Sequence, residues 1–201
     1  MPLLAPYVAS RDSDLPGRTS ELTVEFGSKG PRIAYRNTRS TDRDHHGNLW
    51  VRVRESPGGR VLYDCMNPQR QRVCMERMLC QVCGGPADRN EQGWLFLDWR
   101  RADSPPTWPE RSITSMPPLC AEHARVSVRQ CPFLRRNEHA VLRVRKPRLH
   151  GVSGTVYTLT ARGWHASEND CLSAYDEPRI PGLLASRLHR ELRRVTVVDR
   201  P

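Results

Sequence analysis

The chain has 201 residues, of which 37% are hydrophobic and 27% are charged, a length and composition suited to one domain of ordinary size or two small ones. Its 17 prolines and 13 glycines predict a modest core with long loops, and no apolar stretch is long enough to predict a membrane-spanning helix. The formal net charge of +10 favours a polyanionic partner, usually nucleic acid, and we expect no membrane partner.

The first third of the chain predicts an arm followed by short strands. Residues 1–20 are polar and rich in turn formers, which is typical of a flexible, loosely held arm. The segment 21–66 is β-rich, and alternating apolar residues predict strands at 22–26 and 32–35.

A β-hairpin is expected at the end of this segment. Residues 49–54 alternate apolar and basic side chains, ESPGG supplies a turn, and residues 60–63 return. The face that carries Trp50 and Arg52 suits contact with nucleic acid, but the favoured interpretation is the solvated side of an edge sheet.

Residues 67–80 carry the clearest helix signal in the first half. Asn67 is a suitable N-cap and Pro68 suits the first helical position. The helix predicted here turns Cys74 and Met78 towards the core and runs directly into Cys80.

A strand, a loop and a second helix are expected next. The sequence GWLFLDW predicts a strand at 93–99, and residues 119–130 predict a helix. Between them lies a long proline-rich loop, 100–118, which is a candidate contact surface together with Trp99 and Trp108.

The last third predicts two strands, a loop and a helix. Strands are expected at 140–145 and 155–160, and a long loop at 163–178. An amphipathic helix is expected near residues 182–194, because leucines repeat there every four residues. These leucines are Leu184, Leu188 and Leu192.

Two short pairs of potential metal ligands dominate the centre of the chain. Cys80 and Cys83 lie in CQVCGG, and Cys120 and His123 lie in PPLCAEHA. Two pairs of this kind supply the four donors of a tetrahedral zinc site, because each pair binds the metal from one local turn. The alternative is two unconnected pairs of redox or buried thiol residues.

The order of these pairs resembles that of treble-clef zinc fingers: a CxxCG turn, a strand with a following loop, and CxxH at a helix start. The resemblance implies a knuckle, a hairpin and a helix around one structural Zn²⁺ ion. Residues 67–134 also resemble a group of uncharacterised actinobacterial proteins, through the pattern LCQVCG…PLCxEH and the strings GWLFL and CPFL. That resemblance agrees with a cytoplasmic home and brings no activity with it.

The expected fold class is α+β, with small antiparallel sheets, a treble-clef-like zinc module and a C-terminal amphipathic helix. The zinc module spans residues 67–136. The strands and helix of 137–201 are expected to pack with the rest as one domain.

The nuclease and deaminase activities that such motifs can carry are not supported. HNH-type endonucleases share the treble-clef frame but place a histidine at the end of the first hairpin strand, where this chain offers Asp98. Nucleobase deaminases need a glutamate after the first ligand and a downstream PCxxC, whereas Glu122 lies between two proposed ligands. Catalytic residues are therefore unknown.

The other cysteines and a histidine pair remain outside this motif. Buried inert thiols are the favoured interpretation for most of Cys65, Cys74, Cys131 and Cys171, and a second metal site is the alternative. His45 and His46 lie in a polar loop with Asp42 and Asp44, which we interpret as solvated rather than metal-binding. The opening residues lack a signal-peptide pattern, so we expect a reducing cytoplasm, where paired cysteines bind metal.

Arginine accounts for 30 of the 32 basic residues. It suits phosphate and base-edge contacts, although a GC-rich genome also enriches arginine without selection for binding. The candidate nucleic-acid-binding residues are Arg125, Arg129, Arg135, Arg136, Arg143, Arg145, Lys146, Arg148, Arg187, Arg190, Arg193 and Arg194.

These observations leave three hypotheses. The first is a zinc-stabilised, non-enzymatic protein that binds DNA or RNA or acts as a regulator. The second is an adaptor that binds a protein partner through the loop 100–118. The third is an enzyme with a pocket beside a structural zinc site.

Overall fold

The computed structural model describes residues 4–27, 30–55, 58–178 and 180–198. The chain divides into two compact units. Unit 1 combines the N-terminal residues up to Ser10, the segment Val61–His150 and the C-terminal residues from His189. Unit 2 combines Arg11–Arg60 with Gly151–Leu188.

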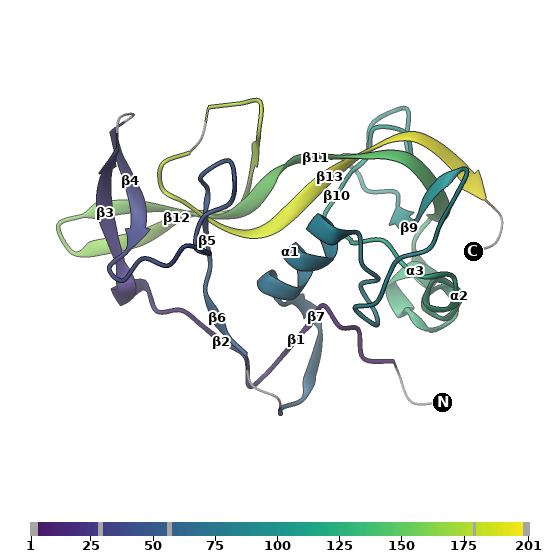
Figure 1. Cartoon of the computed structure of the whole chain (residues 1–201), viewed down its shortest axis with the longest axis horizontal. Coiled ribbons are helices and arrows are strands. Elements are labelled where there is room, and N and C mark those ends of the chain that lie inside the picture. Colours follow the sequence, from purple (N-terminus) through teal and green to yellow (C-terminus); the bar gives the residue numbers. More distant parts are fainter. Residues whose placement is uncertain (1–3, 28–29, 56–57, 179, 199–201) are drawn as a thin grey trace. The chain divides into compact units, whose positions relative to one another are not determined.

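Two long strands contribute residues to both units. They are β11 (His139–Thr160) and β13 (Leu183–Val198), drawn in green and yellow in Figure 1. Each unit is therefore assembled from separate stretches of chain.

Unit 1 contains short helices and a sheet. Besides the first part of β11, the elements that begin in it are β1 (Ala9–Arg11), β7 (Val61–Met66), α1 (Pro68–Arg77), β8 (Arg89–Asn90), β9 (Gly93–Trp99), β10 (Ile113–Thr114), α2 (Ala121–Gln130) and α3 (Pro132–Arg136). Its strand order is β10-β13-β11-β9-β8, and β1 pairs with β7 in a separate sheet. The strand expected at 93–99 is confirmed as β9, and α2 confirms the second helix, which begins two residues later than expected.

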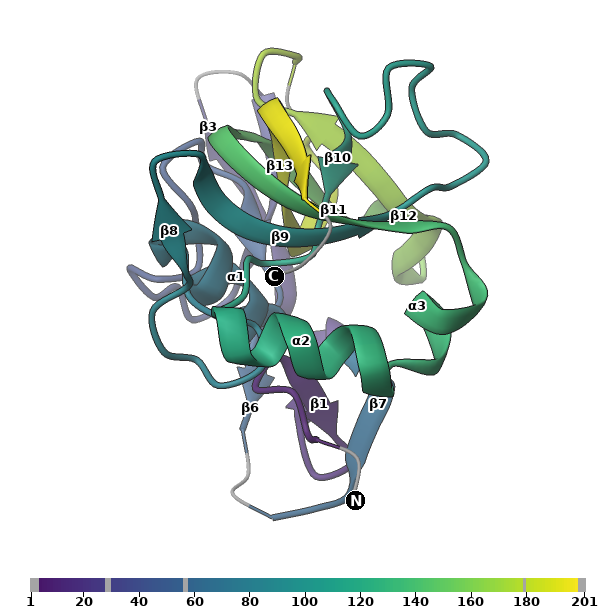
Figure 2. The same ribbon diagram turned by 90° about the vertical axis from the view of Figure 1, so that its right-hand side faces the viewer.

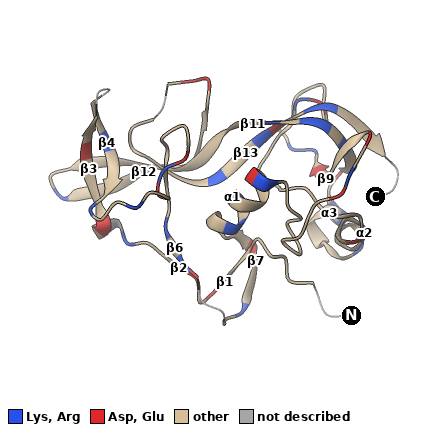
Figure 3. Ribbon diagram, viewed as in Figure 1, with Lys and Arg blue, Asp and Glu red and all other residues tan. Residues whose placement is uncertain are grey.

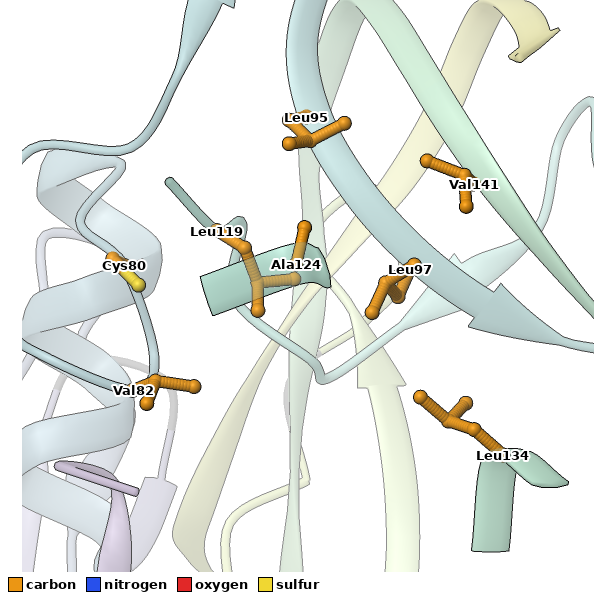
Figure 4. Packing of buried hydrophobic residues seen from close by; sticks show 8 residues of the cluster. All are labelled: Cys80, Val82, Leu95, Leu97, Leu119, Ala124, Leu134 and Val141. Atoms are coloured by element: carbon orange, nitrogen blue, oxygen red, sulfur yellow. The ribbon is translucent and has the colours of Figure 1, made fainter. Parts of the chain in front are cut away.

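One face of the β9–β11 pair packs against α2. Leu95 and Leu97 of β9 lie on this face with Val141 of β11, and they form an apolar cluster with Leu119 and Ala124. Figure 2 shows α2 lying across this side of the sheet, and Figure 4 shows the packed side chains.

The opposite face of the same strands has its own apolar cluster. Because side chains alternate along a strand, Phe96 and Leu142 point away from α2, and both are fully buried. They pack with Leu192 of β13 and with half-buried Trp108 of the loop that follows β9. Both faces of this part of the sheet are thus covered.

The first helix begins where the sequence predicts. The Asn67 side chain accepts hydrogen bonds at 3.1 Å from the backbone N–H groups of Gln69 and Arg70, which caps α1. The helix ends at Met78, which has a left-handed φ of 55°. Cys74 and Met78 are buried, as expected.

Unit 2 is built from short strands and one long hairpin. Its further elements are β2 (Leu15–Pro16), the 3₁₀ turn η1 (Thr19–Glu21), β3 (Leu22–Gly27), β4 (Gly30–Tyr35), β5 (Leu49–Trp50), β6 (Val53–Arg54) and β12 (Gly163–Ala174). The strands expected at 22–26 and 32–35 are confirmed as the antiparallel pair β3–β4. The core of this unit contains Leu22, Ile33, Leu49 and Leu184.

The hairpin expected across residues 49–63 is wrong. Strand β5 pairs with β13, β6 pairs with β2, and β7 pairs with β1. The alternation of apolar and polar residues identified segments that suit strands. Their partner strands, however, come from segments far away in the sequence, which local periodicity does not encode.

The loop expected at 163–178 is mostly strand β12, which pairs antiparallel with the second half of β11. Residues 165–170 are exposed, so the segment lacks the apolar alternation that signals a strand. The strands expected at 140–145 and 155–160 are parts of the one strand β11. Gly154 allows its tight packing, because a Cβ there would lie 2.0 Å from the Leu184 carbonyl oxygen.

The expected C-terminal amphipathic helix is wrong, because residues 183–198 form strand β13. A spacing of four residues is also a multiple of the strand period of two, so Leu188 and Leu192 share one face of a strand as readily as one face of a helix. Arg190 lies between them and is buried on that same face, which hid the alternation.

The residues expected to form a loose arm are partly built into the fold. Val8 and Ala9 are buried, and β1 pairs with β7. Residues 1–3 lie outside the described part of the chain.

Candidate metal centre

The segment Cys80–Gly85 forms a tight turn shortly after α1. The Cys80 N–H donates to the Gly85 carbonyl at 2.7 Å, and the Gly84 N–H donates to the Cys80 carbonyl at 2.8 Å. Gly84 has a left-handed φ of +71°, and a Cβ there would lie 3.2 Å from the Tyr7 ring. A glycine after the second cysteine therefore allows the turn to close.

The second ligand pair lies at the start of α2. Cys120 is the N-cap residue, with extended backbone angles, and His123 is in the first helical turn. The Gln81 N–H donates to the Pro118 carbonyl at 3.0 Å. This backbone bond holds the turn that carries the first pair beside the chain that leads into the second.

The four predicted ligands lie together. The three thiol sulfurs and one imidazole nitrogen are all within 4.8 Å of one another. His123 Nδ1 is 3.0 Å from Cys120 Sγ and 3.9 Å from Cys80 Sγ. Zinc bound tetrahedrally by sulfur and nitrogen separates its donors by about 3.5–3.8 Å. The observed separations lie on both sides of this range, and the four donor atoms are close enough together to form a potential metal site.

The surroundings of the ligands are asymmetric. Cys80 is fully buried and belongs to the apolar cluster beneath α2, as Figure 4 shows, whereas Cys83 is exposed. Cys120 and His123 are half-buried. Cys120 is the N-cap of α2, so the free backbone N–H groups of the first helical turn lie beside this pair of ligands.

Cys74 lies beside this group but has a different role. Its side chain is fully buried, and its thiol lies 3.9 Å from the Cys80 carbonyl oxygen. Burial, and then the negative charges of Cys80 and Cys83, raise the pKa of Cys74 to about 12. It therefore remains a neutral thiol in the core, as expected.

Asp98 does not face the metal ligands. Leu97 packs in the same apolar cluster as Cys80, and the next residue along β9 points to the opposite face. There the Asp98 carboxylate is fully buried and accepts hydrogen bonds from Trp108 Nε1 at 3.0 Å and from Arg101 at 3.3 Å. Asp98 thus anchors the proline-rich loop.

The remaining cysteines do not form a second site. Cys65 is exposed on β7, Cys131 is half-buried between α2 and α3, and Cys171 is half-buried on β12. Among the residues that the structure describes, the group around Cys80 alone brings together three or more potential metal ligands. The expectation of buried thiols thus holds for Cys74 but not for Cys65.

The histidine loop is held by internal contacts of unit 2. His46 stacks on Tyr175 with the ring centroids 3.6 Å apart. Asp44 accepts hydrogen bonds from the Tyr175 hydroxyl at 3.2 Å and from Trp50 Nε1 at 3.3 Å. The carboxylate therefore joins this loop to the segment after β12 and is not arranged for metal binding.

Two of the proposed nucleic-acid-binding arginines are structural. Arg143 is 8% exposed and forms a 2.5 Å ion pair with Asp88. Arg190 is also 8% exposed and donates to the Met75 carbonyl at 3.0 and 2.6 Å. Neither guanidinium is available to a partner, because each is used within unit 1.

Of the other proposed nucleic-acid-binding residues, two form ion pairs with acidic side chains and the rest are exposed. Arg187 pairs with Asp170 at 3.0 Å, and Arg193 pairs with Glu191 at 2.8 Å. The exposed remainder consists of Arg125, Arg129, Arg135, Arg136, Arg145, Lys146, Arg148 and Arg194. Figure 3 shows how basic residues recur along β11 and β13.

A surface feature near α3 was not identified from the sequence. The Phe133 ring meets Trp99 edge to face, with centroids 5.0 Å apart. The Arg101 guanidinium lies over the Trp99 ring, 4.2 Å from its centroid. The only local signal is the string FLRR, in which an aromatic residue stands close to two arginines.

Comparisons with protein-family models, curated proteins and solved structures find no match to this chain. Within its described residues, no helix combines the length and the apolar character that crossing a membrane requires. Function must therefore be inferred from the centre and its surroundings.

Proposed function

We propose that one structural zinc ion, held in a treble-clef-like module, supports a basic surface that binds nucleic acid. The ligands are Cys80, Cys83, Cys120 and His123, whose donor atoms cluster within 4.8 Å. Three thiolates and one imidazole are a common donor set of structural zinc sites. The order of tight turn, β8–β9 hairpin and α2 agrees with such a module.

A structural role suits this donor set better than a catalytic one. Four protein donors fill a tetrahedral coordination shell and leave no open position for water or substrate. The ion would cross-link the Cys80 turn to the start of α2. It would thereby fix the orientation of that helix relative to β9.

The basic surface follows the last ligand directly. Residues 121–150 hold eight basic and two acidic residues, a large share of the net charge of +10. Arg125 and Arg129 are exposed one helical turn apart on α2, and Arg135 and Arg136 are exposed on α3. No ion pair involves any of these four within the described part of the chain, and this observation carries the proposal.

The adaptor hypothesis receives less support. Trp108, the aromatic centre of the loop 100–118, is half-buried, and its indole N–H donates to Asp98. The ring thus packs inward, against the apolar cluster around Phe96.

Binding should be measured by fluorescence anisotropy with labelled DNA and RNA at a series of salt concentrations. We expect affinity to fall steeply with salt, because each phosphate contact contributes about −0.9 to the logarithmic salt slope on duplex DNA. The double substitution Arg125→Gln/Arg129→Gln should reduce the magnitude of this slope by about 1–2.

Each single substitution, Arg125→Gln or Arg129→Gln, should reduce the slope by about 1. Arg162→Gln is the matched control for these single changes, because Arg162 is exposed in the turn between β11 and β12 of unit 2. It removes a positive charge without touching α2, and the slope should stay constant. Absence of binding at low salt would refute the proposal. An equal reduction of the salt slope in Arg162→Gln would also refute it.

A further inference from the structure

Unit 1 carries an aromatic patch, which we define as Phe133 of α3, Trp99 of β9 and Arg101. Trp99 packs against the apolar cluster beneath α2, so its indole is fixed in place. Phe133 rests on it edge to face, and Arg101 covers part of the indole. The patch is therefore a preformed arrangement of two rings and a cation.

The exposure of Phe133 is not explained by the fold. Its side chain is 49% exposed, whereas the next residue, Leu134, is 7% exposed and anchors α3 in the apolar cluster. A short helix held by Leu134 does not need a phenyl ring on its outer side. The exposed part of the ring offers a flat apolar surface to a partner.

The charge around this ring is positive. Arg136 lies three residues after Phe133, which places both on one side of α3, and Arg135 is also exposed. Arg100 is 53% exposed and lies 3.7 Å from Glu138, an exposed acid near the patch. An aromatic ring among several arginines favours a planar, anionic partner over an apolar one.

We propose that Phe133 stacks on an unpaired base of single-stranded DNA or RNA whose phosphates are bound by the surrounding arginines. Bases in a duplex are stacked on their neighbours and do not present a free face, whereas a single strand does. This inference rests on the proposed function and specifies the form of nucleic acid that the basic surface takes.

The test compares single-stranded and duplex oligonucleotides of equal length with the zinc-loaded full chain. Phe133→Leu keeps an apolar side chain but removes the stacking ring. It should weaken single-strand binding by about 5- to 150-fold, the range expected for one base–aromatic contact, and should barely change duplex binding. Phe26→Leu is the matched control, because Phe26 is 82% exposed on β3 of unit 2.

Abasic oligonucleotides provide the second arm. If Phe133 stacks on a base, replacing the contacted base by an abasic site should weaken binding to the wild-type protein but not further weaken binding to Phe133→Leu. Unchanged affinity of Phe133→Leu for single strands would overturn the stacking inference. It would also be overturned if the losses of affinity caused by the abasic site and by Phe133→Leu simply added. Retained salt-dependent binding in that case leaves the proposed function standing, whereas no binding by the wild-type protein would refute both.

Discussion

Asp98 is fully buried, and its carboxylate accepts hydrogen bonds from the Trp108 indole and the Arg101 guanidinium. Burial raises the pKa of Asp98 above its ordinary value, because loss of solvent disfavours the charged form, although Arg101 and Trp108 oppose this effect. Asp98 joins β9 to the proline-rich loop. Because burial disfavours its charged form, the stability of the folded protein depends on pH.

The direction of this dependence follows from proton binding. Between the ordinary pKa near 4 and the raised pKa of the folded protein, the folded state holds more protons, so the wild-type protein loses stability as pH rises through that window. Asp98→Asn keeps an acceptor for Trp108 and removes the charge. Its free energy of unfolding relative to wild type should therefore increase as pH rises.

The measurement is urea denaturation of both proteins at several pH values between about 4 and 8. Each pKa unit of difference between folded and unfolded states corresponds to about 1.4 kcal/mol. Comparison at equal pH cancels the effect of acid on the metal ligands, which both proteins share. A constant difference across the range would show that Asp98 does not titrate in this window.

At the scale of elements, the sequence identifies those with local signals. Helix α1 has its Asn67 cap and β9 has its aromatic run, and the two metal-ligand pairs lie in short turns that need little tertiary information. Strand β12 is exposed and polar, so its structure depends on pairing with β11 rather than on its own pattern. Strand β13 resembled a helix because Arg190 stands where an apolar residue would reveal alternation.

Arg190 is expected to stabilise the junction of β13 and α1. Its guanidinium donates to the Met75 and Pro147 carbonyls, so Arg190→Gln should leave buried acceptors without donors and lower the free energy of unfolding by about 2–4 kcal/mol. Arg187→Gln on the same strand is the control, because Arg187 is 41% exposed and pairs with exposed Asp170. Chemical denaturation of both variants measures the difference, and equal effects would contradict this role of Arg190.

At the scale of the whole molecule, each unit is assembled from segments distant in sequence. This explains why the ligand pairs could be predicted but the aromatic patch could not. Trp99 and Phe133 belong to different elements and meet only when α3 packs against β9, and no periodicity records that contact. The long strands β11 and β13 likewise take partners that local patterns do not specify.

Removal of zinc should act mainly on unit 1, because all four ligands lie there and the core around Leu22 and Ile33 in unit 2 contains none of them. Structural zinc contributes on the order of 10 kcal/mol to the folding of small metal-binding modules. We expect about one zinc per chain in the native protein and none after treatment with a strong chelator. Hydrogen exchange should then accelerate by orders of magnitude at the Cys80 turn and α2.

Exchange in the β3–β4 hairpin of unit 2 is the internal reference and should change little. Cys80→Ser should reproduce the chelated pattern without chelator, whereas Cys65→Ser should not, because Cys65 lies outside the ligand group. If the Cys80 turn and α2 stayed protected without zinc, the ion would not hold this module together. An equal loss of protection in β3–β4 would instead show that the two units unfold as one, because the metal then stabilises residues far from its ligands in the chain.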